Sequence, residues 1–193
     1  MRRNNPVYLM TFCAIAIAAN IVLGIITSLL KLPFYLDTLG TILTAVLIGP
    51  LPGALVGALT NIITGFIYSM RDIPFALVSI AVALITGFIA KKFKFNLITS
   101  IVTGLILSVV APLIGTPIGI ALYGGLTGTV SDVIVMALKN AGASLFTASF
   151  VTKIGNNLID KVGTCLIAYL LIISLPAGMK STLKGYSVKL HNN

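Results

Sequence analysis

Long stretches of this 193-residue sequence carry no charged residue. Residues 7–30 form one such block, and residues 38–70 form another. A helix of about 20 apolar residues crosses the hydrocarbon core of a membrane, where backbone polar groups must be satisfied within the helix. The blocks therefore predict an all-α integral membrane protein. The composition agrees, because 9% of the residues are charged, against about 25% in soluble domains.

Six transmembrane spans follow from these blocks and from the helix breakers between them. Block 38–70 is too long for one span, and the glycines and prolines of residues 49–53 predict a tight turn between two spans, the first of them short. Pro112 and Pro117 predict a helix break, followed either by a kinked extension or by a partly re-entrant or irregular segment after span five. We expect one transmembrane domain over residues 1–193. Its spans are predicted at 7–30, 35–49, 52–70, 73–90, 95–114 and 145–175.

The positions of lysine and arginine predict the orientation. An even number of spans puts both termini on one side of the membrane, and the side richer in basic residues is cytoplasmic. One side carries eight basic residues and no acidic residue: Arg2, Arg3, Lys91, Lys92, Lys94, Lys180, Lys184 and Lys189. The other side carries the remaining five basic residues and all four aspartates. We therefore expect a multi-pass protein of the plasma membrane, with both termini in the cytoplasm and nearly charge-balanced external loops.

Several functions are excluded by what the sequence lacks. His191 is the only histidine and there is no glutamate, so a zinc or iron site has too few ligands. Cys13 and Cys165 lie in apolar runs, which disfavours a disulfide framework. No Cys-His or Ser-His pair and no nucleotide-binding loop is present, and the basic residues form no polar surface for nucleic acid. We expect no enzymatic activity, no cofactor, no metal and no nucleic-acid partner.

Polar residues in or beside the apolar blocks are the candidates for ligand binding, because a polar group in a membrane is costly unless it is paired or lines water. We expect a small-molecule site at the external end, formed by Asp37, Thr38, Asn61, Tyr68, Arg71, Asp72, Asn156, Asn157, Asp160 and Lys161. Taken singly, some of these residues also suit structural roles. Asp37 and Thr38 can cap a helix, and Asp160 can pair with Lys161.

Small residues recur at four-residue spacing in span one. Ala14 and Ala18 share one helix face, and Ala16, Asn20 and Gly24 form an overlapping row. Small side chains let two helices approach closely in lipid. The pattern fits either packing inside the bundle or docking of another membrane protein.

Five features occur together along the whole chain. They are its length, the small-residue strip 14–18, the block Leu36-Asp37-Thr38-Leu39-Gly40-Thr41, the turn 49–53 with Gly57, and Asp160-Lys161 ahead of a final span ending at Leu175-Pro176. In this combination the sequence resembles the S components of energy-coupling factor (ECF) transporters. These are small six-span vitamin-binding subunits of a class of ABC transporters.

The resemblance implies an external binding site closed by the loops after spans one, three and five. It also implies that Ala14 and Ala18 dock on a membrane coupling subunit, the T component, which works with two cytoplasmic ATPases. The partners would then be these subunits, a vitamin-like small molecule and the lipid bilayer. The sequence carries no signature for riboflavin, thiamine, biotin or folate, so the substrate stays open.

Two other functions remain as alternatives. A membrane ligand sensor would need a separate signalling subunit, because about 17 residues follow Pro176 and form no output domain. An ion-coupled secondary transporter normally has acidic groups near the middle of the membrane. The mid-span candidates here are Asn20 and Asn61, which favours the S component.

Overall fold

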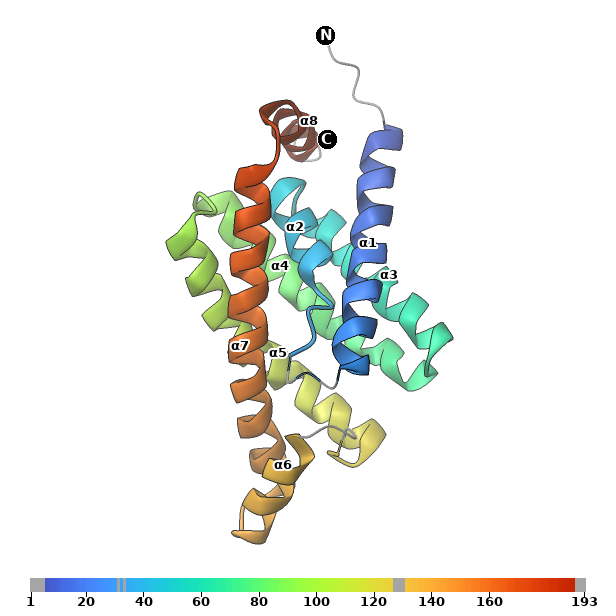
Figure 1. The fold of residues 1–193 in the computed structure, drawn as a ribbon, viewed down its shortest axis with the longest axis vertical. Helices are drawn as coiled ribbons and strands as arrows, with labels where there is room; N and C mark the ends of the chain where they lie inside the picture. The colour runs from blue at the N-terminus through green and yellow to red at the C-terminus, as the bar shows by residue number, and fades with distance from the viewer. Residues whose placement is uncertain (1–5, 31, 33, 127–130, 190–193) are drawn as a thin grey trace.

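The computed structural model describes residues 6–30, 32, 34–126 and 131–189, the last six of these by their backbone only. The described residues form helices and no β-strand (Figure 1). The helices are α1 (Pro6–Leu29), α2 (Leu39–Leu47), α3 (Pro50–Ile67), the 3-10 helix η1 (Met70–Phe75), α4 (Ala76–Lys92), α5 (Leu97–Tyr123), α6 (Ser131–Asn140), α7 (Leu145–Ser174) and α8 (Ala177–Lys189).

Five of these helical segments are long and apolar enough to cross a membrane, namely α1, α3, η1 with α4, α5 and α7. The remaining expected span corresponds to α2, which has nine residues and follows the non-helical segment 34–38. The all-α membrane fold is confirmed, and six spans are roughly consistent with these elements. Figure 1 shows the start of α1 and helix α8 at one end of the molecule, here called the terminal end. Helix α6 lies at the opposite, distal end.

Helix α5 does not break at its two prolines. It continues from Leu97 to Tyr123 with Pro112 and Pro117 inside it, so it is an extension of span five beyond residue 114. Each proline removes one backbone N–H, and a packed helical neighbour can compensate for that loss. Here the neighbour is α7, whose Lys153 donates from Nζ to the carbonyl of Gly115, between the two prolines, at 3.3 Å. The described chain leaves the helix only at Gly124, and residues 127–130 lie outside the described part.

Helix α2 lies in the centre of the bundle. Seven of its nine residues are buried, and it contacts α1, α3, α4, α7 and α8. A Cβ atom on Gly40 would overlap the backbone carbonyl of Ala16. Glycine at this position therefore lets the backbones of α1 and α2 touch, and the first turn of α2 begins inside the protein.

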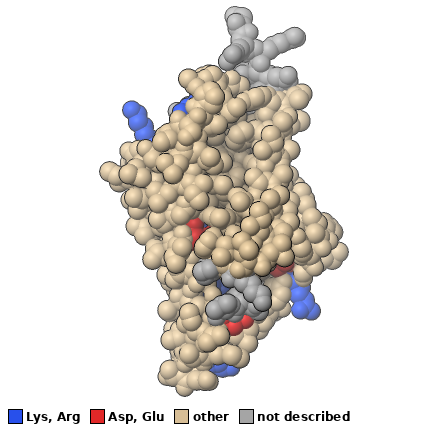
Figure 2. All heavy atoms as spheres, in the orientation of Figure 1, with Lys and Arg blue, Asp and Glu red and all other residues tan. Residues whose placement is uncertain are grey.

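Helix α8 covers the terminal end of the bundle. Its Leu183 is completely buried against Leu47 and Ile48, where α2 ends, and Tyr8 and Phe12 of α1 pack on the same cluster. The helix thereby joins the ends of α1, α2 and α7. Figure 2 shows that most of the visible surface is uncharged, with basic side chains at the terminal end and in the distal half, and acidic atoms from the middle toward the distal end.

Candidate functional site

A pair of opposite charges is buried in the middle of α7. The Nζ atom of Lys161 lies 2.6 Å from Oδ2 of Asp160, and their side chains are 4% and 0% exposed. Helix α7 runs from Leu145 to Ser174, so both residues lie near its middle. A buried charge costs several kcal/mol unless it is paired and hydrogen-bonded. The other hydrogen bonds of Asp160 and Lys161 therefore indicate the role of this ion pair.

The carboxylate of Asp160 holds the chain that leads into α2. Its Oδ1 atom accepts hydrogen bonds from the backbone N–H groups of Tyr35 and Leu36, at 2.9 and 2.8 Å. Leu36 has a φ of 50°, a left-handed conformation that costs a residue with a side chain about 1–2 kcal/mol. From α1, the hydroxyl of Thr27 donates to the carbonyl of Tyr35 at 2.7 Å. Segment 34–38 is thus fixed between α1 and α7.

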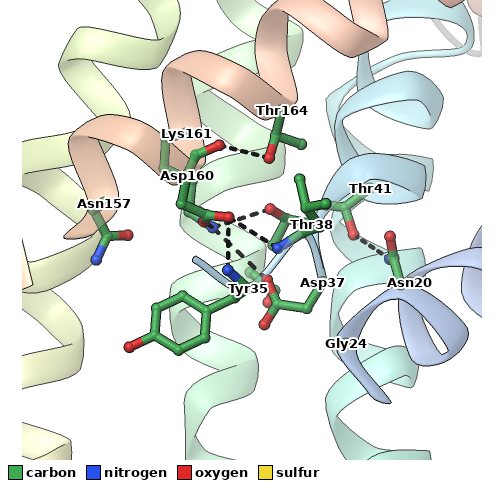
Figure 3. Close-up of polar contacts among 12 residues, drawn as sticks. Asn20, Gly24, Tyr35, Asp37, Thr38, Thr41, Asn157, Asp160, Lys161 and Thr164 are labelled. Carbon is green, nitrogen blue, oxygen red and sulfur yellow. Dashed lines mark hydrogen bonds and ion pairs between the residues drawn. The ribbon is translucent and has the colours of Figure 1, made fainter. Parts of the chain in front are cut away.

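Lys161 reaches from α7 to the residues just before α2. Its Nζ atom donates to Oγ1 of Thr38 at 3.0 Å and lies 3.8 Å from Oδ1 of Asp37. Thr38 occupies the N-cap position of α2, yet its side chain makes no capping hydrogen bond. The capping role considered for Thr38 is therefore not observed. Figure 3 shows these side chains meeting at one place between α7 and α2.

Asp37 is the charged member of this cluster that another molecule can reach. Its side chain is 46% exposed, whereas those of Asp160 and Lys161 are buried. When all three groups are ionised, two carboxylates and one ammonium group leave a net negative charge. The N-terminus of α2 points its positive dipole end toward that charge. The carboxylate of Asp37 can therefore accept a hydrogen bond from a donor group of a ligand.

Asn157 lies one helical turn before Lys161 on the same face of α7. It is buried, and its Nδ2 atom donates to the carbonyl of Lys153 at 2.9 Å; Figure 3 shows it to one side of the charged groups. Asn156 has a different contact, because its Nδ2 atom donates to Oγ of Ser131 in α6 at 2.7 Å. We refer to Asp37, Thr38, Asn157, Asp160 and Lys161 as the polar cluster.

Such a polar cluster inside an apolar bundle is unusual, because membrane spans rarely contain paired charges without a function. Residues 4–176 match the family model described as "ECF-type riboflavin transporter, S component". The chain belongs to this family. No curated protein and no solved structure matches the chain. The S component is a substrate-binding subunit of a transporter rather than an enzyme, and the family implies a T component, ATPase subunits and a small-molecule substrate as partners.

Two of the expected site residues in this S component make other contacts. Asn61 of α3 donates from Nδ2 to Oγ of Ser79 in α4 at 2.7 Å, which ties two neighbouring helices together. Asp72 accepts a hydrogen bond of 2.6 Å from the hydroxyl of Tyr123, which ties η1 to the end of α5. No hydrogen bond or ion pair described for either residue reaches the polar cluster.

Tyr68 and Arg71 lie in and beside the turn between α3 and η1, and both are exposed. Among the described residues, no group of three or more histidine, cysteine, aspartate or glutamate side chains is arranged to hold a metal ion. The S component therefore brings four of the ten expected site residues into contact, namely Asp37, Thr38, Asp160 and Lys161, and places Asn157 one helical turn away on α7. Sequence reasoning missed the backbone N–H groups of Tyr35 and Leu36, because a backbone contact leaves no residue type to recognise.

The two small-residue rows of α1 face opposite ways in the S component. Ala16 and Asn20 are buried against the bundle, whereas Ala14 and Ala18 are exposed. The close approach to Gly40 uses the carbonyl of Ala16. Ala16 and Asn20 thus pack inside the bundle, whereas Ala14 and Ala18 are accessible to a partner.

Proposed function

We propose that this S component binds riboflavin, or a closely related flavin, at the polar cluster and delivers it inward when docked on its coupling module. The observation that carries the proposal is the buried pair Asp160–Lys161, which holds segment 34–38 and Thr38 at the first turn of α2. Ionisable groups inside a membrane bundle are retained mainly for function. The family description supplies the name of the vitamin.

The chemistry of a flavin fits these side chains. The pyrimidine edge of its ring system presents one N–H donor between two carbonyl acceptors. Asp37 can accept from the N–H group, and the amide of Asn157 can either donate to a carbonyl or accept from the N–H group. Tyr35 is partly exposed beside them and supplies an aromatic surface for the flat ring.

The remaining parts of the proposed cycle follow from the two faces of α1. Ala14 and Ala18 form the contact for the T component, and two cytoplasmic ATPases bound to that subunit hydrolyse ATP. The S component itself contains no nucleotide-binding loop. The polar cluster takes its ligand from outside the cell, and the terminal end faces the cytoplasm.

The orientation can be tested with single cysteines in a protein whose Cys13 and Cys165 are replaced by alanine. We expect Arg71→Cys to react with a membrane-impermeant maleimide in intact cells. We expect Ser181→Cys, in α8, to react only after the membrane is permeabilised, because eight basic residues lie on that side. Labelling of position 181 in intact cells would contradict the proposed orientation.

Ligand binding can be tested on the purified protein by the quenching of riboflavin fluorescence. We expect the wild type to bind riboflavin and Asp37→Asn to weaken binding about tenfold or more, because a hydrogen bond to a charged group contributes about 1.5–3 kcal/mol. The melting temperature should change little, since Asp37 is half exposed and lies 3.8 Å from Lys161.

Asp72→Asn is the matched control, because the carboxylate of Asp72 already accepts from Tyr123. Its affinity for riboflavin should stay close to that of the wild type. Equal affinities of the wild type and Asp37→Asn would remove Asp37 from the site. A wild type that binds no flavin, in a folded and monodisperse preparation, would contradict the proposed substrate.

A further inference from the structure

We infer that Asn20 is a positioning residue of the ligand site, which caps α2 from the neighbouring helix α1 and thereby leaves the hydroxyl of Thr38 to Lys161. The inference rests on the proposed function for its effect on affinity. Its structural part concerns the start of α2 and can be measured without a ligand.

The cap itself is a single short hydrogen bond between helices. Oδ1 of Asn20 accepts from the backbone N–H of Gly40 at 2.6 Å, and Gly40 is the second residue of α2. The first N–H groups of a helix have no partner within the helix. The side chain at the N-cap position usually supplies that partner, but the side chain of Thr38 does not.

The amide group of Asn20 is held in one orientation. Its Nδ2 atom donates to the hydroxyls of Thr41 and Thr60, at 2.9 and 3.1 Å, and the residue is completely buried. Because Gly40 contributes a donor, only the amide oxygen can face it. Figure 3 shows Asn20 on the side of α2 opposite to α7, so α2 is held from both sides.

The two contacts at the start of α2 depend on each other. A threonine that caps its helix must turn its hydroxyl toward the N–H groups of the first turn. Here the hydroxyl of Thr38 accepts from Lys161 instead. Without Asn20, the buried N–H group of Gly40 needs a new partner, and Thr38 supplies one by turning its hydroxyl back toward the helix and releasing Lys161. That change disturbs the cluster proposed to hold the flavin.

The first test compares two asparagines whose side chains link helices, the buried Asn20 and the partly buried Asn61. Asn20→Ala should lower the affinity for riboflavin about tenfold or more, measured on the folded fraction. Asn61→Ala is the matched control, since its side chain joins α3 to α4 and has no described contact with the polar cluster. It should lower the melting temperature and leave the affinity unchanged. Equal affinity losses in both variants would overturn the inference.

A double-mutant cycle separates positioning from general loosening of the fold. Thr38→Val removes the hydroxyl through which Asn20 is inferred to act. In that background Asn20→Ala should cost little further affinity, whereas independent effects would add. Additive losses would overturn the inference.

Hydrogen exchange tests the cap in the absence of flavin. In Asn20→Ala the backbone N–H groups of residues 39–42 should exchange faster than in the wild type, while those in the middle of α4 keep their rates. If Asn20→Ala does not fold, Thr60→Val removes one of the bonds that orient the amide and should show the same change at smaller size. Unchanged exchange at residues 39–42 would overturn the inference even if riboflavin binds. Faster exchange in a protein that binds no riboflavin would support it and reject only the proposed substrate.

Discussion

Lys161→Met is expected to destabilise the folded protein by about 3–5 kcal/mol, because it leaves the buried carboxylate of Asp160 without its counter-charge. Methionine keeps most of the length of the side chain, so loss of packing adds little. The two groups lie 2.6 Å apart with almost no exposure, and Lys161 also donates to Thr38. The free energy of unfolding, measured by titration with sodium dodecyl sulfate, checks this expectation, and riboflavin binding should be lost with it.

The double variant Asp160→Asn/Lys161→Met supplies the control. The oxygen of the asparagine can still accept from the N–H groups of Tyr35 and Leu36, as Oδ1 of Asp160 does. In the single variant Asp160→Asn, the amide nitrogen at position 160 would face the ammonium group of Lys161. In the double variant that ammonium group is absent, so the amide nitrogen faces no charge. We therefore expect the double variant to be more stable than Lys161→Met. Additive losses would contradict a pair that acts as a unit.

Ala14→Leu and Ala18→Leu are each expected to abolish riboflavin uptake by cells and co-purification with the T component. A leucine side chain on this exposed face would hold a partner helix away, because close packing of helices in lipid depends on small residues. The solitary protein should keep its affinity for riboflavin, since Ala14 and Ala18 are exposed, whereas Ala16 and Asn20 face the bundle.

Gly155→Leu is the control for this experiment. Gly155 is also an exposed small residue in a membrane helix, and no atom of its surroundings lies within 4 Å of a Cβ placed on it. We expect normal assembly and uptake from this variant. Normal uptake by Ala14→Leu and Ala18→Leu would show that the proposed coupling contact lies elsewhere.

The membrane fold could be predicted because the property that specifies it is local. A charge-free apolar stretch of sufficient length has few alternatives in water or in lipid, and residues 7–30 accordingly form most of α1. Proline was less informative. The ring and the missing N–H of proline predict a helix break. In this protein, however, α7 packs along α5 and the helix continues through Pro112 and Pro117.

The site could be predicted only as a set of residue types. Asp160 contacts the backbone of Tyr35, 125 positions earlier in the chain, and no local pattern encodes such a pairing. Thr38 carries the sequence signal of an N-cap, yet the cap is supplied by Asn20. A local rule fails at this point because a residue from another helix performs the same task.

The shortness of α2 has a consequence for the distance that the cargo must travel. Nine residues at a rise of 1.5 Å each make a helix roughly 13 Å long, less than half of the about 30 Å of hydrocarbon in a bilayer. A flavin held at the first turn of α2 has, in the proposed orientation, already descended past the outer part of the membrane by diffusion alone. In the proposed cycle, ATP hydrolysis by the partner subunits would then supply the energy for the remaining part of the path and for its direction.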